Sequence, residues 1–307
     1  MTNCIAFHSY KGGTGKSTIS SNLAALMATQ GFSVVLLDLD VYAPSLQTYF
    51  NTRPRKWIND FLFDQADLDE VIIDSNSILI NFLKENGNTD NKTISNLDKG
   101  KFYVGFSSTS KEDIYKLDGF ARQETSKVQL LRKFIMMREE ISEQYDPDYI
   151  IIDTSPGIRY WSINALAVAN AILLSLKMDG IDIEGTRILS KEIYSSFAKL
   201  GTQAYLLLNR IAGYCHPPTL LPQNENKSNE THSSTSTNTL YSNILNEQSS
   251  TITKLKEDMS MDVISSIPCY CDIQFDSREF LTSLKYPQHP FTQQLLDLIT
   301  ELEKLFK

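Results

Sequence analysis

The stretch Lys11-Gly12-Gly13-Thr14-Gly15-Lys16-Ser17-Thr18 decides the fold of this chain. It approximates the phosphate-binding pattern G-x-x-x-x-G-K-[ST], with Ser9 in place of the first glycine. Its three glycines allow left-handed φ angles, so backbone N–H groups can wrap a polyphosphate at close approach. In this pattern Lys16 neutralises the β and γ oxygens, and Ser17 supplies a hydroxyl ligand to Mg2+. The stretch therefore predicts a nucleotide site with a magnesium ion, and a glycine-rich turn without a ligand is the alternative.

The residues around this stretch predict an open α/β sheet. Apolar residues at 5 and 7 indicate a strand before it, and those at 19, 23, 26 and 27 recur at helical spacing up to Gly31. A second strand, residues 34–37, ends in Asp38-Leu39-Asp40. Open α/β sheets bind ligands at the carboxyl ends of their strands, and strand alternation puts Asp38 and Asp40 on one face. One carboxylate can hold magnesium-bound water and the other can orient the attacking water.

A third strand supplies another acid. Residues 149–152 are apolar, as in a strand buried on both faces, and Asp153 follows them. This is the position of a carboxylate that binds magnesium through water, although apolar strands end in Asp in many parallel sheets.

These motifs together resemble the ParA/MinD family of P-loop ATPases, whose phosphate-binding loop carries the extra lysine seen here as Lys11. The resemblance implies a three-layer α/β/α fold with a mostly parallel central sheet and helices on both faces. It also implies that ATP joins two subunits, with Lys11 reaching the phosphates bound by the partner subunit, much as an arginine finger does. Asp38 to Ser45 resembles the first switch, which gives Asp40 the water-orienting role. The second switch corresponds to Asp153-Thr154-Ser155-Pro156-Gly157. Val41 stands where partition members carry proline, and Tyr42-Ala43-Pro44-Ser45 is more like MinD.

The same resemblance extends to the base and ribose of the nucleotide. Residues 204–208 indicate a buried strand, followed by Asn209 and Arg210. The asparagine corresponds to the family residue whose amide reads adenine, because an amide presents both a donor and an acceptor. Pro268 corresponds to a loop that closes over base and ribose. A plain strand end and a plain turn are the alternatives at these positions.

Length and composition agree with a single domain over 1–307. With 307 residues and 41% hydrophobic content the chain can bury one large α/β core. An apolar run of membrane-spanning length is absent from the sequence, so we expect a cytoplasmic protein, with peripheral association at a membrane or the nucleoid left open. The four cysteines are too few and too irregular for a disulfide framework, and we expect them to be reduced.

Two segments depart from the family core. Segment 57–101 is variable and acidic, and its apolar residues from 58 to 72 predict one acidic-faced helix followed by a flexible loop. Segment 223–250 is rich in Asn, Ser and Thr and predicts a flexible insertion. Either segment can be a partner contact or plain solvated surface.

Charge bears on what the protein acts on. The chain has a net charge of -8 and lacks an extended cluster of Lys and Arg, so nonspecific DNA binding is disfavoured. Residues 295–307 form an amphipathic pattern with an acidic polar face, which anionic lipid repels, so packing on the domain is favoured over membrane binding.

Two functions follow from the resemblance. The first is a Mg2+-dependent ATPase, slow without an activating protein partner, that forms an ATP-sandwich homodimer. It would position or partition a cargo such as a chromosome or plasmid, a division site or a surface structure. The alternative is an ATP-dependent assembly or carrier factor, like relatives that load metal clusters or target tail-anchored proteins. That class uses a C-x-x-C pair or a methionine-rich groove, whereas this chain has Cys269-Tyr270-Cys271.

Overall fold

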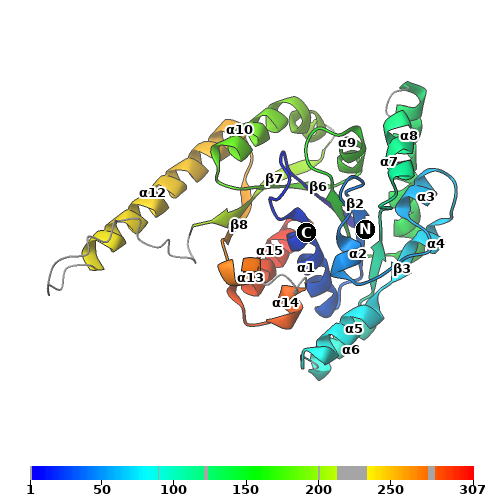
Figure 1. The fold of residues 1–307 in the computed structure, drawn as a ribbon, viewed down its shortest axis with the longest axis horizontal. Helices are drawn as coiled ribbons and strands as arrows, with labels where there is room; N and C mark the ends of the chain where they lie inside the picture. The colour runs from blue at the N-terminus through cyan, green and yellow to red at the C-terminus, as the bar shows by residue number, and fades with distance from the viewer. Residues whose placement is uncertain (1, 89, 121–123, 200, 213–233, 276–280) are drawn as a thin grey trace.

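One mostly parallel sheet forms the centre of the molecule. The computed structural model describes residues 2–88, 90–120, 124–199, 201–212, 234–275 and 281–307. Within these residues eight strands lie in the order β3-β4-β2-β5-β1-β6-β7-β8 (Figure 1). All pair in parallel except β3 with β4. The strands are β1 Asn3–His8, β2 Val34–Leu39, β3 Ile72–Asp74, β4 Phe102–Gly105, β5 Tyr149–Thr154, β6 Ala171–Leu176, β7 Gln203–Ile211 and β8 Val263–Pro268.

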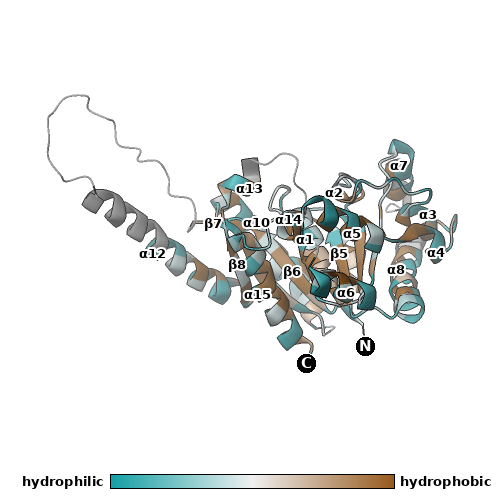
Figure 2. Ribbon diagram, turned by 90° about the horizontal axis from the view of Figure 1, so that it is seen from below, coloured by the Kyte–Doolittle hydropathy of each residue, from teal (hydrophilic) through white to brown (hydrophobic). Residues whose placement is uncertain are grey.

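Helices lie on both faces of the sheet (Figure 2). Two buried apolar clusters, one on each face, hold the three layers together. One face packs against α1 Lys16–Thr29, α2 Leu46–Tyr49, α5 Asn76–Glu85, α6 Asn91–Lys99, α13 Cys271–Phe275, α14 Thr282–Lys285 and α15 Pro290–Leu305. The other packs against α3 Ile58–Leu62, α4 Leu68–Val71, α7 Lys111–Phe120, α8 Glu124–Tyr145, α9 Tyr160–Ala167, α10 Gly180–Leu189, η1 Ser190–Tyr194, α11 Ser195–Ala198 and α12 Ser234–Met259. The predicted three-layer α/β fold is confirmed.

The register of the parallel strands brings the predicted site residues to one edge. Strands β1, β2 and β5 are buried along almost their whole length, as their apolar sequences predict. Asp38 of β2 pairs in register with Asp153 of β5, and Asp153 pairs on its other side with Phe7 of β1. The loop that follows β1 therefore starts next to both carboxylates.

The two variable segments differ from their predictions. Residues 58–72 form two short helices, α3 and α4, instead of one, because Asp64 turns the chain with a φ of 59°. The edge strand β3 then follows, and the next residues form α5 and α6. In the second segment residues 223–233 lie outside the described residues, but Ser234 onward forms the helix α12, which extends away from the sheet (Figure 1). Leu255 and Met259 anchor its C-terminal end in the core, which composition alone did not predict.

The chain ends in a helix that packs on the domain, as its acidic polar face predicted. Leu295, Leu298, Ile299 and Leu302 of α15 are buried against the sheet. None of the described helices has the length and apolar character that crossing a membrane requires.

The expectation that the cysteines are reduced is wrong for Cys271, which is disulfide-bonded, whereas Cys4 and Cys269 are not in a disulfide.

Candidate functional site

The loop between β1 and α1 builds the centre of the site from backbone conformation. Gly13 and Gly15 have φ angles of 76° and 93°, in the left-handed region that glycine adopts without strain. Strand β7 also approaches Gly15 closely, because a Cβ at this position would lie 2.2 Å from Nδ2 of Asn209. Glycine is therefore needed at position 15 for both conformation and space, and α1 begins directly after it.

Ser9 positions the lysine that starts the helix. The Lys16 side chain is buried, and its Nζ donates a hydrogen bond to Oγ of Ser9 at 2.9 Å. That hydroxyl in turn donates to the carbonyl oxygen of Lys11 at 2.7 Å. Burial lowers the pKa of Lys16, and the nearby carboxylates of Asp153 and Asp40 oppose this shift. The sequence shows Ser9 only as a departure from the glycine pattern, and its role in holding the lysine was not predicted.

Asp153 offers two free oxygens beside this lysine. Its side chain is fully buried, and neither oxygen accepts a hydrogen bond of ordinary geometry from the described residues. Burial raises the pKa of Asp153 to about 7, while the charge of Lys16 and the Ser17 hydroxyl favour the ionised form. Buried oxygens without partners next to a hydroxyl are the ligands that Mg2+ accepts, so these residues fit the predicted magnesium ion.

Asp38 is engaged with the backbone of the loop that follows β2. One of its oxygens accepts a hydrogen bond from N of Asp40 at 3.1 Å, and the other accepts from N of Ser45 at 3.2 Å and N of Leu46 at 3.1 Å. Burial and the neighbouring Asp153 charge raise its pKa well above the usual range. In this structure Asp38 therefore anchors the first switch, and of the two carboxylates predicted to serve the metal, Asp153 is the one with free oxygens.

Asp40 connects the two switches at the edge of a cavity. Its Oδ1 accepts hydrogen bonds from N of Ala43 at 3.2 Å and from Oγ of Ser155, in the second switch, at 2.8 Å. The cavity has a volume of about 370 Å³. It is lined by Gly12, Gly13, Gly15, Lys16, Ser17, Thr18, Asp40, Tyr42, Ala43, Pro156 and Arg210. The structure thus brings most of the predicted phosphate-binding residues and Asp40 together around one space.

Of the three residues predicted to contact adenine or ribose, only Arg210 lines the cavity. Nδ2 of Asn209 donates to the carbonyl oxygen of Thr14 at 2.7 Å, and its Oδ1 accepts from N of Arg210 at 2.9 Å. The amide is buried and holds the phosphate-binding loop against β7; one N–H and one lone pair of Oδ1 remain, and its contact with adenine stays a prediction. Arg210 lines the cavity, whereas Pro268 pairs with Ile211 in the β7–β8 ladder and is not among the lining residues.

His8 has a role that the sequence motifs do not indicate. It is fully buried at the end of β1, and its Nδ1 lies 2.7 Å from Oγ1 of Thr154 in the second switch. That hydroxyl donates to the carbonyl oxygen of Phe7 at 2.7 Å. Burial, helped by the charge of Lys16, lowers the pKa of His8 to about 3, so the imidazole is neutral at physiological pH. A neutral histidine here ties β1 to the second switch.

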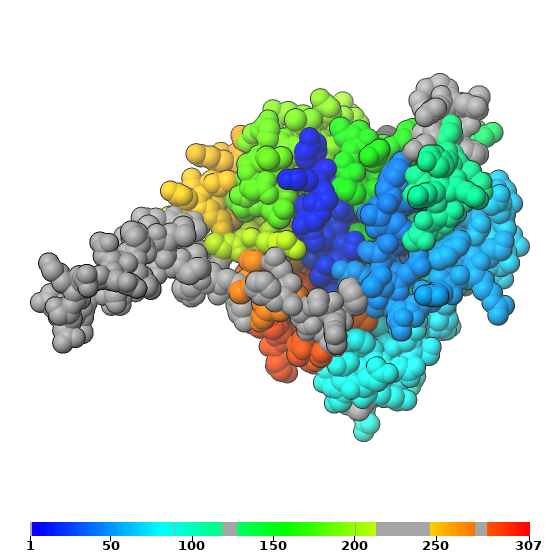
Figure 3. Space-filling view, viewed as in Figure 1, coloured from blue at the N-terminus to red at the C-terminus, as the bar shows by residue number. Residues whose placement is uncertain are grey.

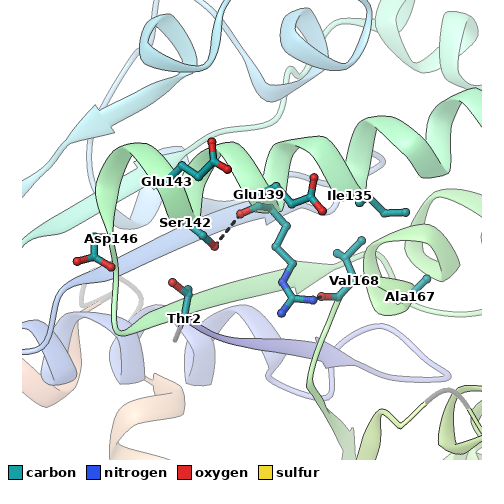
Figure 4. Close-up of a pocket in the computed structure, with 9 residues that line it drawn as sticks. Thr2, Ile135, Glu139, Ser142, Glu143, Asp146, Ala167 and Val168 are labelled. Atoms are coloured by element: carbon teal, nitrogen blue, oxygen red, sulfur yellow. Dashed lines mark hydrogen bonds between the residues drawn. The ribbon is translucent and has the colours of Figure 1, made fainter.

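A further cavity, of about 570 Å³, lies at the opposite edge of the sheet, where the strands begin. It is lined by residues that precede β1, β5 and β6 and by α8, including Thr2, Arg138, Asp146 and Val168 (Figure 4). Arg138 already has hydrogen-bond partners, because its guanidinium donates to the carbonyl oxygen of Val168 and to Oδ1 of Asn170. None of the predicted site residues lines it.

The chain is similar to known proteins over most of its length. A sequence profile described as an AAA domain matches residues 2–202. An uncharacterised protein of Borreliella burgdorferi is 24% identical over 193 residues, which span 62% of this chain and 66% of that protein. The sporulation initiation inhibitor protein Soj of Bacillus subtilis is 27% identical over 187 residues, 60% of this chain and 62% of Soj. The chain thus matches less than two thirds of the length of each of these relatives.

Solved structures show the same fold. The septum site-determining protein MinD of Pyrococcus horikoshii, solved with Mg-ADP, superimposes with a TM-score of 0.66 at 17% identity, over 99% of this chain and 97% of that one.

Proposed function

Because the chain belongs to the ParA/MinD family of P-loop ATPases, we propose that it is a Mg2+-dependent ATPase that works as a dimerising switch. The observation that carries this proposal is the buried Asp153 carboxylate, whose two unpartnered oxygens lie beside the phosphate-binding lysine. Such an arrangement is costly in an empty site, because an unsatisfied buried carboxylate loses its hydration. A bound nucleotide and metal would supply the missing partners.

In this proposal each group at the cavity has a defined task. The backbone of Gly12 to Thr18 wraps the phosphates, and the Lys16 ammonium pairs with their oxygens. Ser17 and Asp153 would hold Mg2+, directly and through water, and the ion would neutralise charge on the β and γ phosphates. Asp40 orients the attacking water, since its carboxylate faces the cavity from the first switch while its Oδ1 is fixed by Ser155.

The position of Lys11 supports a role toward a second subunit. Its side chain is exposed and is not among the residues that line its own cavity. Exposed apolar residues lie on two segments that contact residues 9 and 10: Ile158 follows the second switch and is 55% exposed, and Ile181 in the first turn of α10 is 66% exposed. Two large exposed aliphatic side chains beside a nucleotide cavity are typical of a protein–protein contact surface. A second copy of the chain would cover them and bring its Lys11 to the phosphates.

The family setting supports positioning or partitioning as the output of the switch. Soj and MinD carry names that describe sporulation and septum placement in their own organisms. We propose that this chain likewise positions a cargo, acts with an activating protein partner, and works in the cytoplasm or at a surface facing it. The carrier alternative has less support, because Cys271 of the C-x-C pair is disulfide-bonded and its thiolate is not available to a metal cluster.

Replacing the buried lysine tests the proposal. Lys16→Ala removes the point charge on the phosphates, so ATP affinity measured with a fluorescent analogue should fall by about 100-fold or more, and phosphate release should cease. The matched control is Lys84→Ala, which removes an exposed lysine on α5 and should leave both values unchanged. Circular dichroism of both variants separates loss of binding from loss of fold. Normal ATP binding by folded Lys16→Ala protein would contradict the proposed site.

A further inference from the structure

A groove of about 610 Å³ lies between the segment that follows the first switch and helix α5. Its lining includes Gln47, Thr48, Thr52 and Arg53 on one side and Phe82 and Glu85 on the other. Figure 3 shows the blue surface of residues 40–60 meeting the cyan surface of α5 on one face of the molecule. The groove and the nucleotide cavity share no lining residue. It is therefore a separate site, and none of the residues assigned to ATP binding belongs to it.

The segment beside this groove concentrates positive charge on an acidic protein. Three of the four residues from 53 to 56 are basic, whereas the whole chain has a net charge of -8. Arg53 and Arg55 are exposed, and neither guanidinium has a hydrogen-bond or ion-pair partner among the described residues. Lys56 is half-buried, and its Nζ donates to the carbonyl oxygen of Gln65. Arg53 thus lines the groove with an unpaired guanidinium, and Arg55 follows it two residues along the chain, outside the lining.

We propose that this groove binds an acidic segment of a partner protein, whose carboxylates pair with Arg53 and Arg55. A guanidinium presents planar paired donors that match a carboxylate. The hydroxyl group of Thr48 adds a further donor along the lining, and the Phe82 ring offers an apolar wall. Recognition of acidic motifs by clustered arginines is a recurring mode of peptide binding.

The charges around the groove favour a peptide over a nucleic acid. A nucleic acid carries phosphates at regular short intervals, so it needs a long basic track. Here Arg53 shares the lining with Glu85, Arg55 lies nearby in the chain, and the whole chain has a net charge of -8. A peptide can place its carboxylates at the arginines and a neutral residue at Glu85, which a uniform polyanion cannot do.

The groove is joined to the nucleotide site by two contacts. The hydroxyl of Tyr49, which also lines the groove, lies 2.8 Å from Oγ1 of Thr18 in the first turn of α1. Asp38 accepts from the backbone N–H groups of Ser45 and Leu46 at the start of α2. This coupling rests on the proposed function: a nucleotide that shifts the first switch also shifts one wall of the groove. By linkage, the affinity of the acidic segment then differs between the ATP and ADP states.

Fluorescence anisotropy with a fluorescein-labelled peptide of about ten residues, in which a run of glutamates is followed by neutral residues, tests the proposal. The full chain is titrated with Mg-ATP, with Mg-ADP and without nucleotide. We expect saturable binding that weakens about tenfold in the Arg53→Glu, Arg55→Glu double variant, because two charge-assisted contacts become repulsive. Glu85→Gln should tighten binding. The matched control reverses two exposed charges elsewhere, Lys191→Glu with Lys199→Glu, and should change the affinity less than twofold.

Each other outcome has a defined meaning. Equal losses of peptide affinity in the two double variants would show a general charge effect and overturn the groove assignment. Arginine-dependent binding of a single-stranded oligonucleotide or of phosphatidylglycerol vesicles, without binding of the peptide, would overturn the acidic-peptide assignment. Groove-dependent binding that is equal with Mg-ATP and Mg-ADP would support the site and overturn its coupling to the switch. Failure of the wild-type chain to bind ATP would contradict the proposed function instead, since peptide binding without nucleotide is measured independently.

Discussion

Gly15 has the most demanding position of any residue in the nucleotide site. Its φ of 93° lies in the left-handed region, where a side chain with a Cβ costs about 1–2 kcal/mol. The Asn209 amide occupies the space that this Cβ would need. Gly13 has a similar φ of 76°, but a Cβ there would meet no atom within 4 Å. Alanine substitutions at the two glycines therefore separate the free-energy cost of the left-handed φ from the cost of the close contact with Asn209.

Gly15→Ala should lower the free energy of unfolding by about 2–3 kcal/mol, because it adds left-handed strain and displaces the amide that bonds to the Thr14 carbonyl. Gly13→Ala should lower it by about 1 kcal/mol, from strain alone. Urea denaturation followed by circular dichroism measures both values. Equal losses in the two variants would contradict the close approach of Asn209.

Single residues also show the limit of motif reading. The octapeptide predicted most of the residues that line the cavity beside Lys16, because glycine conformations and a lysine at fixed spacing are local properties of the chain. Ser9 and His8 were not recognised, since their roles depend on contacts with Lys16 and Thr154 that only the folded chain creates. The Asn209 amide was assigned to adenine by resemblance, and in this structure it bonds to the phosphate-binding loop.

At the scale of elements, the Asp38 carboxylate bonds to both ends of the first switch. Asp38 ends a buried strand and accepts hydrogen bonds from Asp40, Ser45 and Leu46, so one side chain fixes the start and the end of the loop. Ser107 Oγ also donates to the carbonyl oxygen of Asp38, which joins β4 to the same point. The loop can change conformation only if these hydrogen bonds break or shift together.

Asp38→Asn should loosen the first switch, because an amide presents an N–H group where the carboxylate accepted hydrogen bonds. Hydrogen–deuterium exchange of the nucleotide-free protein should be faster over residues 40–46 than in the wild type. Asp60→Asn is the matched control, since Asp60 accepts from N of Trp57 at the start of α3. It should affect exchange near 57–60 only. Unchanged exchange over 40–46 in Asp38→Asn would contradict the anchoring role.

Element prediction succeeded where periodicity and burial act along the sequence. The sequence predicted the buried strands β2 and β5 and helix α1, because their apolar patterns are continuous. The prediction of one helix over residues 58–72 was wrong, because the two short helices α3 and α4 share one approximate periodicity and no glycine marks the turn at Asp64. Helix α12 was missed because its polar composition resembles a flexible linker, and its stability comes from Leu255 and Met259 packing at one end. The basic groove went unnoticed because its charges form too short a run to stand out in an acidic chain.

For the whole molecule, the central claim is that nucleotide controls the association of two copies. Lys11 lies outside its own cavity, and Ile158 and Ile181 are exposed on the two segments that contact residues 9 and 10. ATP hydrolysis would remove the γ phosphate to which the second lysine is drawn, so the dimer should separate after turnover. A variant that binds ATP without hydrolysing it should therefore accumulate as the dimer.

The most direct test is the molar mass of Asp40→Ala protein, measured by light scattering on a sizing column with Mg-ATP and with Mg-ADP. Removing the carboxylate that we propose orients the attacking water should preserve the ATP state, so we expect twice the 34.8 kDa of the chain with Mg-ATP and a single copy with Mg-ADP. Adding Lys11→Ala should return the ATP sample to the mass of one copy. A mass that is the same with both nucleotides, or a dimer that persists without Lys11, would contradict the account.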